Sequence, residues 1–355
     1  MTDTVLVTGA FGLVGSATVR RLLDDGRRVV ATDLDVPANR RAAAGLPPST
    51  EVRWADLTDP TAVDALLSAV SPAAIIHLAA IIPPMCYARP ALARRVNVHA
   101  TDLLLNAAKA LSAPPRFVQA SSVAAYGARN PHHVTHVLTA ETPLWPADNY
   151  GAHKAEAEQL VGNSGLDFVI LRLGGVLTAE PRFDVDPDTL YFEASLPVDG
   201  RIQTVDVRDA ARAFAAASTA PAVGETLLIG GDHSHRLLQG DIAQAVAAAM
   251  GLAGAIPPGR KGNPDSDDDW FATDWMETKR SQQVLDFQRV SWPQLLAETA
   301  DRMGWRRLPA RLAAPVVRML LRRSSPYYRH PGRYADPWGV IRAKWNDPRP
   351  EGSQT

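Results

Sequence analysis

A glycine-rich turn lies close to the start of the chain, directly after a short run of apolar residues. Residues 4–15 read TVLVTGAFGLVG, so Gly9, Gly12 and Gly15 are three positions apart. The pattern predicts a strand over 4–8 and a helix over 12–24. Glycines there permit a tight turn, close backbone approach and close packing of the helix on the strand. Because a helix N-terminus favours negative charge, the turn predicts a site for dinucleotide phosphates.

The alternation of apolar runs and helical patterns continues to about residue 173. Further strands are predicted at 28–32, 51–54, 74–78, 116–120 and 168–173, and further helices at 61–70, 91–111 and 150–161. Near-continuous apolar strands separated by helices are typical of a parallel sheet covered on both faces. We therefore expect an α/β fold, in which residues 1–175 form a doubly wound, Rossmann-type domain.

The alternation breaks down after Gly174. Residues 204–214 predict a strand and a helix, and 224–232 predict another strand, so we expect the chain to return to the first domain at about 202–232. We expect residues 176–355 otherwise to form a smaller α/β lid that binds substrate, followed by a C-terminal extension. The basic and apolar segment 308–323 favours a packing helix interrupted by Pro315, with a membrane surface or a partner subunit as alternatives.

The composition excludes several other classes of protein. The formal net charge is −1, which gives no reason to expect nucleic acid or an anionic membrane as the main partner. Cys86 is the only cysteine of the sequence. No histidine or other base lies at a recognisable spacing that would activate its thiol, so we interpret Cys86 as a packing residue. The histidines of PHHVTHV (131–137) are interpreted as a loop, and no metal is expected. Without an apolar run of about 20 residues or an apolar leader, we expect a cytoplasmic protein with no integral membrane segment.

An acidic residue ends the second predicted strand. Asp33 is placed to accept hydrogen bonds from both ribose hydroxyls and to repel a 2′-phosphate, which favours NAD over NADP. Arg40 and Arg41 follow closely and would tolerate a phosphate, so NADP is disfavoured without being excluded. Asp56 and Leu57 are predicted to bracket the adenine. The remaining predicted cofactor contacts are Gly9, Phe11, Gly12, Leu13, Val14 and Gly15 in the turn, and Leu78, Ala79 and Ala80 at the end of the fourth strand.

Three polar residues further along the chain form a combination that one class of reaction requires. Ser122 lies at the carboxyl end of the fifth predicted strand, in QASSVAAYG, and Tyr150 and Lys154 lie one helical turn apart in NYGAHK. In hydride transfer between an alcohol carbon and nicotinamide, Tyr150 would take or return the proton. Its free pKa is ~10, so work near pH 7 needs about 4 kcal/mol of differential stabilisation. Lys154 and a positive nicotinamide would supply it, both Tyr150 and Lys154 would contact NAD, and Ser122 would hold the substrate oxygen.

Seven motifs, taken in order, resemble those of the extended short-chain dehydrogenase/reductase superfamily of the NAD-dependent epimerase/dehydratase type. They are TGAFGLVG, ADL, HLAA, VNVHATDLLLNA, SSVAAYG, YGAHK and LRLGGV, and the likeness covers roughly residues 3–305. The resemblance implies that Ser122, Tyr150 and Lys154 are the catalytic serine, tyrosine and lysine. It also implies that Asn97, in the predicted helix over 91–111, is the catalytic-site asparagine found in the fourth helix of superfamily members.

Departures from the superfamily pattern indicate the reaction branch. SSVAAYG lacks the Thr-Asp-Glu of dehydratases; Gly175 stands where nucleotide-sugar epimerases carry an asparagine, and Asp206 where they carry a histidine. We therefore predict an NAD-dependent oxidoreductase acting on an alcohol or ketone. The alternatives are an NAD-retaining nucleotide-sugar epimerase and a non-catalytic NAD-sensing protein.

The loop IIPPMCYARP (81–90) is predicted to cover the nicotinamide and to touch the substrate. Its residues Ile82 and Met85 favour a moderately apolar small molecule, with Ser122 and Gly175 as further substrate contacts. A hydrophobic loop that only packs against the lid is the alternative. We also expect the protein to be a homodimer.

Overall fold

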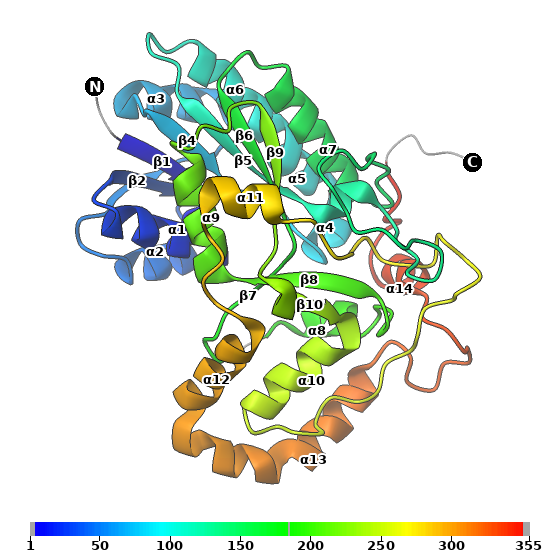
Figure 1. The fold of residues 1–355 in the computed structure, drawn as a ribbon. Coiled ribbons are helices and arrows are strands. Elements are labelled where there is room, and N and C mark those ends of the chain that lie inside the picture. The colour runs from blue at the N-terminus through cyan, green and yellow to red at the C-terminus, as the bar shows by residue number, and fades with distance from the viewer. Residues whose placement is uncertain (1–3, 184, 351–355) are drawn as a thin grey trace.

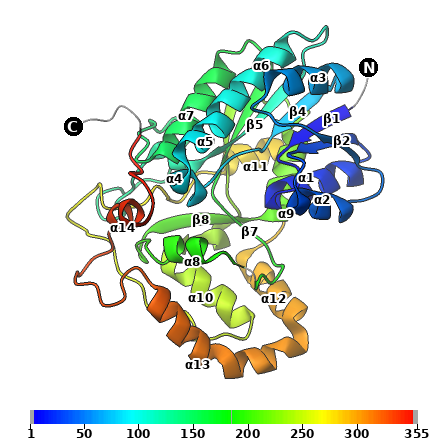
Figure 2. The same cartoon turned by 180° about the vertical axis from the view of Figure 1, so that it is seen from behind.

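The larger layer of the protein is a seven-stranded sheet. The computed structural model describes residues 4–183 and 185–350, and Figures 1 and 2 show its two sides. The strands follow the spatial order β3-β2-β1-β4-β5-β6-β9, and every neighbouring pair is parallel. Their bounds are β1 (Thr4–Thr8), β2 (Arg28–Asp33), β3 (Glu51–Trp54), β4 (Ala74–His77), β5 (Arg116–Ser122), β6 (Phe168–Leu173) and β9 (Glu225–Ile229). The prediction of a Rossmann-type parallel sheet is confirmed.

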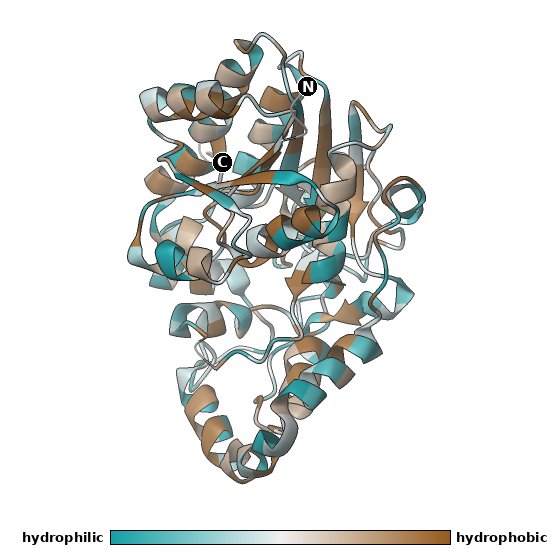
Figure 3. Cartoon of the chain, turned by 90° about the vertical axis from the view of Figure 1, so that its left-hand side faces the viewer, coloured by the Kyte–Doolittle hydropathy of each residue, from teal (hydrophilic) through white to brown (hydrophobic). Residues whose placement is uncertain are grey.

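Helices cover both faces of this sheet. One face carries α1 (Leu13–Asp24), α2 (Pro37–Ala44) and α9 (Val207–Ala217), and the other carries α3 (Pro60–Val70), α6 (Ala100–Lys109) and α7 (Asn149–Gly162). Strand β1 shows why: Val5 and Val7 belong to the core under α1 and α9, while Leu6 belongs to the core under α3 and α6. Successive side chains of a strand alternate between faces, so a strand apolar at every position needs cover on both. Figure 3 shows hydrophobic strands lying between these helices.

The predicted helix over 91–111 is three consecutive helical segments. They are α5 (Pro90–Arg94), a π-helical turn η1 (Arg95–His99) and α6, preceded by the short helix α4 (Met85–Ala88). Asn97 lies inside the π-helical turn and is buried. Such turns are rare and are frequent at functional sites.

The second layer is a three-stranded sheet with helices below it (Figure 1). Strand β8 (Arg201–Asp206) lies parallel to β7 (Gly175–Leu177) and antiparallel to β10 (Arg236–Leu238). The segment at about 202–232 was predicted to return to the first domain. Its strand β9 joins the large sheet and its helix α9 packs on that sheet, whereas its strand β8 lies in the small sheet. The helices of this part and of the C-terminal extension are α8 (Pro187–Glu193), α10 (Gln239–Ala249), α11 (Lys279–Leu285), α12 (Trp292–Met303), α13 (Arg307–Ser324) and α14 (Pro337–Lys344).

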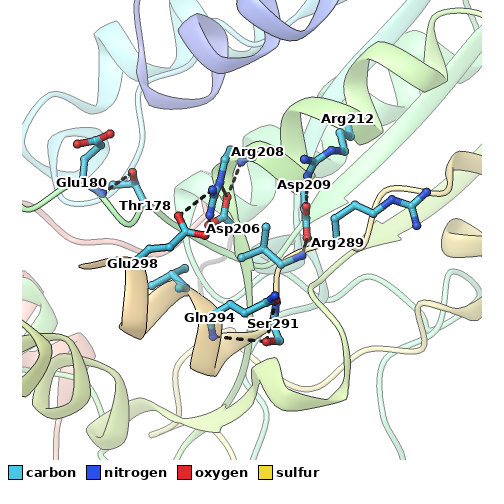
Figure 4. A network of polar contacts seen from close by, with 12 residues as sticks. Thr178, Glu180, Asp206, Arg208, Asp209, Arg212, Arg289, Ser291, Gln294 and Glu298 are labelled. Atoms are coloured by element: carbon cyan, nitrogen blue, oxygen red, sulfur yellow. Dashed lines mark hydrogen bonds and ion pairs between the residues drawn. The ribbon is translucent and has the colours of Figure 1, made fainter. Parts of the chain in front are cut away.

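A cluster of charged residues joins the two layers (Figure 4). Asp206, at the end of β8, accepts hydrogen bonds from the backbone N–H of Arg208 at 2.8 Å and from its side chain at 2.9 Å, and so caps α9. The Arg208 guanidinium also pairs with Glu298 of α12 at 2.8 Å. Asp209 pairs with Arg212 and accepts the backbone N–H of Arg289 at 2.9 Å. Helix α9, which packs on the large sheet, is thereby tied to α12 and to the segment just before it.

Helix α13 continues through Pro315, so the predicted interruption is wrong. Pro315 is exposed, and the carbonyl group that loses its helical partner can therefore hydrogen-bond to water. Only Ala314 of this helix is buried, so the helix does not serve mainly as a packing element. Within residues 4–183 and 185–350, no helix has the length and apolar character needed to cross a membrane.

Candidate active site

The glycine turn between β1 and α1 is shaped by close contacts on one side and open space on the other. Gly9 has φ +62°, and a Cβ atom added there would lie 2.6 Å from the backbone nitrogen of Ala79. A Cβ at Gly15 would collide with the carbonyl oxygen of Gly9. At Gly12 the nearest atom would be 3.5 Å away, and no side chain among the described residues caps the N-terminus of α1. The turn therefore presents backbone N–H groups to a space that an anion can enter.

Asp33 lies beside this turn, at the carboxyl end of β2. Its carboxylate accepts the backbone N–H of Leu34 at 2.8 Å and that of Phe11, in the glycine turn, at 3.5 Å. Burial raises the pKa of Asp33, and these hydrogen bonds oppose the rise. A partly buried carboxylate of this kind gains from further hydrogen-bond donors such as ribose hydroxyls.

The first arginine after Asp33 in the sequence is engaged elsewhere. Arg40 donates two hydrogen bonds to Asp35, at 2.5 and 2.7 Å. Its guanidinium is therefore held by a carboxylate of its own loop, which weakens the case for a 2′-phosphate site beside Asp33.

The other residues predicted to contact the cofactor surround the same edge of the sheet. Asp56 is exposed and accepts hydrogen bonds from the backbone and the hydroxyl group of Thr58, whereas Leu57 is buried in the core under α3. Leu78, Ala79 and Ala80 follow β4 and are partly exposed. The assignment of these residues to adenine and nicotinamide contacts stays a prediction.

Helix α7 brings Tyr150 and Lys154 against the end of β5. Lys154 Nζ donates a hydrogen bond to the carbonyl oxygen of Ala120 at 2.9 Å and lies 5.7 Å from the centroid of the Tyr150 ring. Ser122, the last residue of β5, is hydrogen-bonded to the Tyr150 hydroxyl. The three residues predicted to act together therefore meet at the carboxyl edge of the parallel sheet, where open α/β folds bind ligands.

Burial moves the pKa values of this pair in opposite directions. It raises the pKa of Tyr150 well above its ordinary value, which the hydrogen bond with Ser122 opposes. It lowers the pKa of Lys154 to about 8, which the charge of Glu158 opposes. In the protein without cofactor the pKa of Tyr150 is thus raised, whereas the sequence analysis expected Lys154 to lower it, because burial has the largest effect.

Two buried acidic residues that the sequence analysis did not single out support this helix. Asp148 caps α7 by accepting the Gly151 N–H at 2.8 Å, and it accepts the Tyr87 hydroxyl at 2.5 Å. Burial raises the pKa of Asp148 to about 6. The sequence could have indicated the role of Asp148, because an Asp directly before a helical pattern is a preferred N-cap.

Glu158 lies four residues after Lys154, on the same face of α7. It accepts two hydrogen bonds from Arg172 of β6, at 2.9 and 2.6 Å, and one from Ser121 of β5 at 2.5 Å. The spacing of Tyr150, Lys154 and Glu158 was visible in sequence, whereas the two partners come from strands that only the fold brings close.

Asn97 acts on the loop over residues 81–90. Its side chain accepts the backbone N–H of Ile81 at 2.7 Å and donates to the Ile81 carbonyl at 2.9 Å. The amide is therefore used to position this loop, in which Ile82 and Met85 are 57% and 46% exposed. Their exposure leaves them available to a substrate, and the contact itself stays a prediction.

The C-terminal extension closes over the same region. Asn346 donates to the carbonyl of Tyr87 at 2.7 Å, and the N–H of Asn149 donates to the carbonyl of Pro348 at 2.6 Å. Ile341 of α14 is buried in one cluster with Cys86 and Tyr87, so Cys86 is a packing residue. No sequence pattern indicated that this segment reaches the residue before Tyr150.

Gly175 and the 131–137 loop are the remaining features that the sequence singled out, and the substrate contact assigned to Gly175 stays a prediction. Gly175 is partly buried in β7, where an added Cβ would lie 3.1 Å from Ile202 Cδ1. In the 131–137 loop, His133 Nδ1 is 2.7 Å from the carboxylate of Asp267. Among residues 4–183 and 185–350, no three His, Cys, Asp or Glu side chains are grouped to hold a metal ion.

Comparison with known protein families assigns the chain to a family of NAD-dependent proteins. The model of the NAD-dependent epimerase/dehydratase family matches residues 5–230, which is more than half of the chain. The chain belongs to this family. NAD is the cofactor of the family, and the prediction of NAD is therefore confirmed.

The curated relatives of this chain include proteins named for two different reactions. D-erythronate dehydrogenase from Cupriavidus necator is 34% identical over 170 residues, covering 45% of this chain and 49% of the relative. UDP-glucose 4-epimerase from Azospirillum brasilense is 32% identical over 182 residues, covering 50% of each. The chain thus matches about half the length of these curated relatives.

Solved structures show the likeness of fold over most of the chain. UDP-glucose 4-epimerase from Thermus thermophilus, in complex with NAD, superposes with a TM-score of 0.68 at 23% identity, covering 85% of this chain and 99% of the other. The enzyme WbmH from Bordetella bronchiseptica, in complex with NAD⁺, gives a TM-score of 0.67 at 23% identity, covering 87% and 100%.

Proposed function

We propose that this protein is an NAD-dependent oxidoreductase that transfers hydride between NAD and an alcohol or ketone. The observation that carries the proposal is the meeting of Ser122, Tyr150 and Lys154 at one edge of the sheet. The relatives of the chain include both a dehydrogenase and an epimerase. The choice between these two reactions therefore rests on the residues around the three side chains.

The glycine turn and Asp33 are the residues that would hold the cofactor. The N–H groups at the start of α1 would receive the phosphates over Gly12, and Asp33 would receive the ribose hydroxyls. NAD supplies the hydride acceptor in one direction of the reaction and the donor in the other.

The proton of the reacting hydroxyl group is handled by Tyr150. In oxidation the substrate O–H proton passes to the deprotonated Tyr150 oxygen while hydride leaves the carbon that carries the reacting oxygen. In reduction the tyrosine returns the proton to that oxygen and the carbon receives hydride. Because burial raises the pKa of Tyr150, the side chain stays protonated until a positive charge lies beside it. Ser122 holds the substrate oxygen, and Lys154, anchored on Ala120, adds positive charge near the Tyr150 ring.

The dehydrogenase reaction is favoured by the two departures from the epimerase pattern. Asp206, in place of a histidine, is fully buried and occupied by Arg208 and the N-terminus of α9. Gly175, in place of an asparagine, offers no side chain to a sugar diphosphate. The exposed apolar side chains of Ile82 and Met85 add apolar surface at the loop that we expect to meet the substrate.

The first experiment measures the cofactor that the purified protein retains. We expect a protein that is largely empty and binds added NAD reversibly, and that then oxidises or reduces members of an alcohol and ketone panel that includes D-erythronate. Stoichiometric NAD released only on denaturation, with turnover of UDP-sugars and of no panel member, would replace the proposal by an epimerase. NAD binding without turnover of either set would indicate a sensor.

The second experiment tests the role assigned to Tyr150. Tyr150→Phe removes the proton-transferring oxygen, so we expect kcat to fall by about 100-fold or more while the Kd for NAD changes little. Tyr334→Phe, which removes a hydroxyl group from the C-terminal extension, is the matched control and should retain activity. Equal activity of Tyr150→Phe and the wild type would refute the mechanism.

A further inference from the structure

Helix α13 carries a row of large apolar side chains that are about half or more exposed. Leu308, Leu312, Val316, Met319 and Leu320 are 64%, 84%, 55%, 46% and 54% exposed. At 3.6 residues per turn these positions fall within an arc of about 120° on one side of the helix. The side that faces the protein is a different one, because Ala314 is the buried residue. Trp305, just before the helix, is 75% exposed.

The segment that contains this helix is strongly basic. Residues 302–335 include nine arginines and no aspartate or glutamate, so the remaining residues carry a formal charge of about −10 against −1 for the whole chain. The near-zero net charge therefore conceals a separation of charge between this segment and the rest of the molecule. Figure 1 shows α13 at the end of the molecule furthest from the large sheet.

A hollow beside the C-terminal half of α13 gathers four of the arginines of this part of the fold. Its volume is about 420 Å³, and Arg260, Arg318, Arg322 and Arg329 line it together with Tyr327. Arg260 lies 4.3 Å above the Tyr327 ring, which fixes its guanidinium at the wall. Arginines grouped in this way bind phosphate groups through paired N–H donors.

We propose that α13 and this hollow dock the protein on the surface of an anionic phospholipid bilayer. The apolar row would enter the interface between headgroups and acyl chains, and the arginines would bind the lipid phosphates. A second copy of the chain fits less well, because pairing this face with itself would bring two arginine-rich surfaces together. Nucleic acid would use the arginines and leave five exposed apolar side chains without a partner.

Flotation with vesicles tests the proposal on the full chain. With vesicles of phosphatidylcholine containing 30% phosphatidylglycerol, chosen as about one anionic lipid in three, we expect the protein to float. Pure phosphatidylcholine and a raised salt concentration should both reduce the bound fraction, because the attraction to the bilayer is partly electrostatic. Millimolar inorganic phosphate should leave the protein on the vesicles, which distinguishes docking on a bilayer from capture of a free anion.

Two variants separate the apolar row from the arginines. Leu312→Glu and Arg322→Glu should each lower the vesicle partition coefficient by about tenfold or more. The matched controls are Val223→Glu, an exposed apolar position next to β9, and Lys109→Glu at the end of α6. Both controls should bind like the wild type, and all four variants should retain its Tm within about 2 °C, since none replaces a buried residue.

Three outcomes would overturn the proposal. The first is an absence of flotation at any phosphatidylglycerol content. The second is binding that Leu312→Glu leaves unchanged, which would make the arginines alone responsible and favour a nucleic acid or a free anion. The third is a concentration-dependent dimer that Leu312→Glu dissociates, which would assign the face to a second copy of the chain.

Discussion

Glu158 and Glu156 offer a direct test of how burial decides the value of an ion pair in this protein. Both lie on α7, and each makes a two-pronged pair with an arginine: Glu158 with Arg172 and Glu156 with Arg94. The side chains of the first pair are 6% and 7% exposed, and those of the second are 40% and 31% exposed. The two pairs thus share their chemistry and their helix and differ in burial.

Truncation of each glutamate should therefore have different costs. Glu158→Ala leaves the Arg172 charge buried, which lowers the free energy of unfolding by about 3–5 kcal/mol. Arg172 keeps its hydrogen bonds to the Tyr126 hydroxyl at 2.6 Å and the Ala140 carbonyl at 3.1 Å, which favours the lower end of that range. Glu156→Ala should cost about 0–1 kcal/mol, because water solvates the arginine that remains.

Thermal unfolding measures the difference. At an unfolding entropy of about 2.1 cal/mol/K per residue, the entropy of the 355-residue chain rises by about 0.7 kcal/mol/K on unfolding. Dividing each free-energy cost by this entropy, Glu158→Ala should lower Tm by about 4–7 °C and Glu156→Ala by about 1 °C or less. Replacing Glu158 and Arg172 together by Leu and Met should recover part of the loss, since no unpaired charge then remains. Equal shifts for the two single variants would refute the reasoning.

Two further predictions concern Asp33 and Asp148. Asp33→Ser removes the carboxylate assigned to the ribose, so the ratio of the Kd values for NAD and NADP should move about tenfold or more toward NADP in titration calorimetry; equal affinity of the wild type for the two cofactors would contradict the assignment. The pKa of Asp148 is raised from 3.8 to about 6 by burial. The folded chain therefore binds this proton more tightly than the unfolded chain between pH 4 and 6, and the contribution of Asp148 to stability falls as the pH rises through that window. Asp148→Asn keeps an oxygen for the α7 cap and cannot ionise, so its Tm relative to the wild type should rise from pH 4 to pH 7; a difference independent of pH would show that Asp148 is not titrating there.

The parallel sheet and the meeting of the three residues proposed to be catalytic could be predicted because both depend on local patterns. The glycine turn, the apolar strands and the Tyr150–Lys154 spacing are read from a few neighbouring residues each, and the structure places them as expected. The π-helical turn around Asn97 could not be predicted, because a helical pattern of the same length does not distinguish α from π hydrogen bonding. Likewise, the pair of Glu158 with Arg172 depends on β6 lying beside β5, which is a property of the whole sheet.

The charge of the chain is distributed unevenly, which a whole-chain average does not show. A net charge of −1 gives no reason to expect an anionic main partner, yet residues 302–335 carry nine arginines and no carboxylate side chain. The apolar positions of α13 were also visible in sequence, but only the fold shows that they face away from the core. Local charge and exposure together, and not the average composition, support the proposed docking surface.

Glu158 has a second consequence for the site that it supports. Any positive charge that arrives beside Tyr150 stabilises its phenolate form and so lowers the pKa of the tyrosine, as proton transfer requires. The same charge repels the ammonium group of Lys154 and lowers the pKa of the lysine, which burial, partly offset by Glu158, has already brought to about 8. Without compensation the lysine would lose its proton near neutral pH and with it the charge that assists Tyr150. The carboxylate of Glu158, one helical turn further along α7, raises the pKa of Lys154 and opposes that loss. The buried pair of Glu158 and Arg172 therefore maintains the fold of the sheet edge and also keeps the lysine of the proposed active site charged.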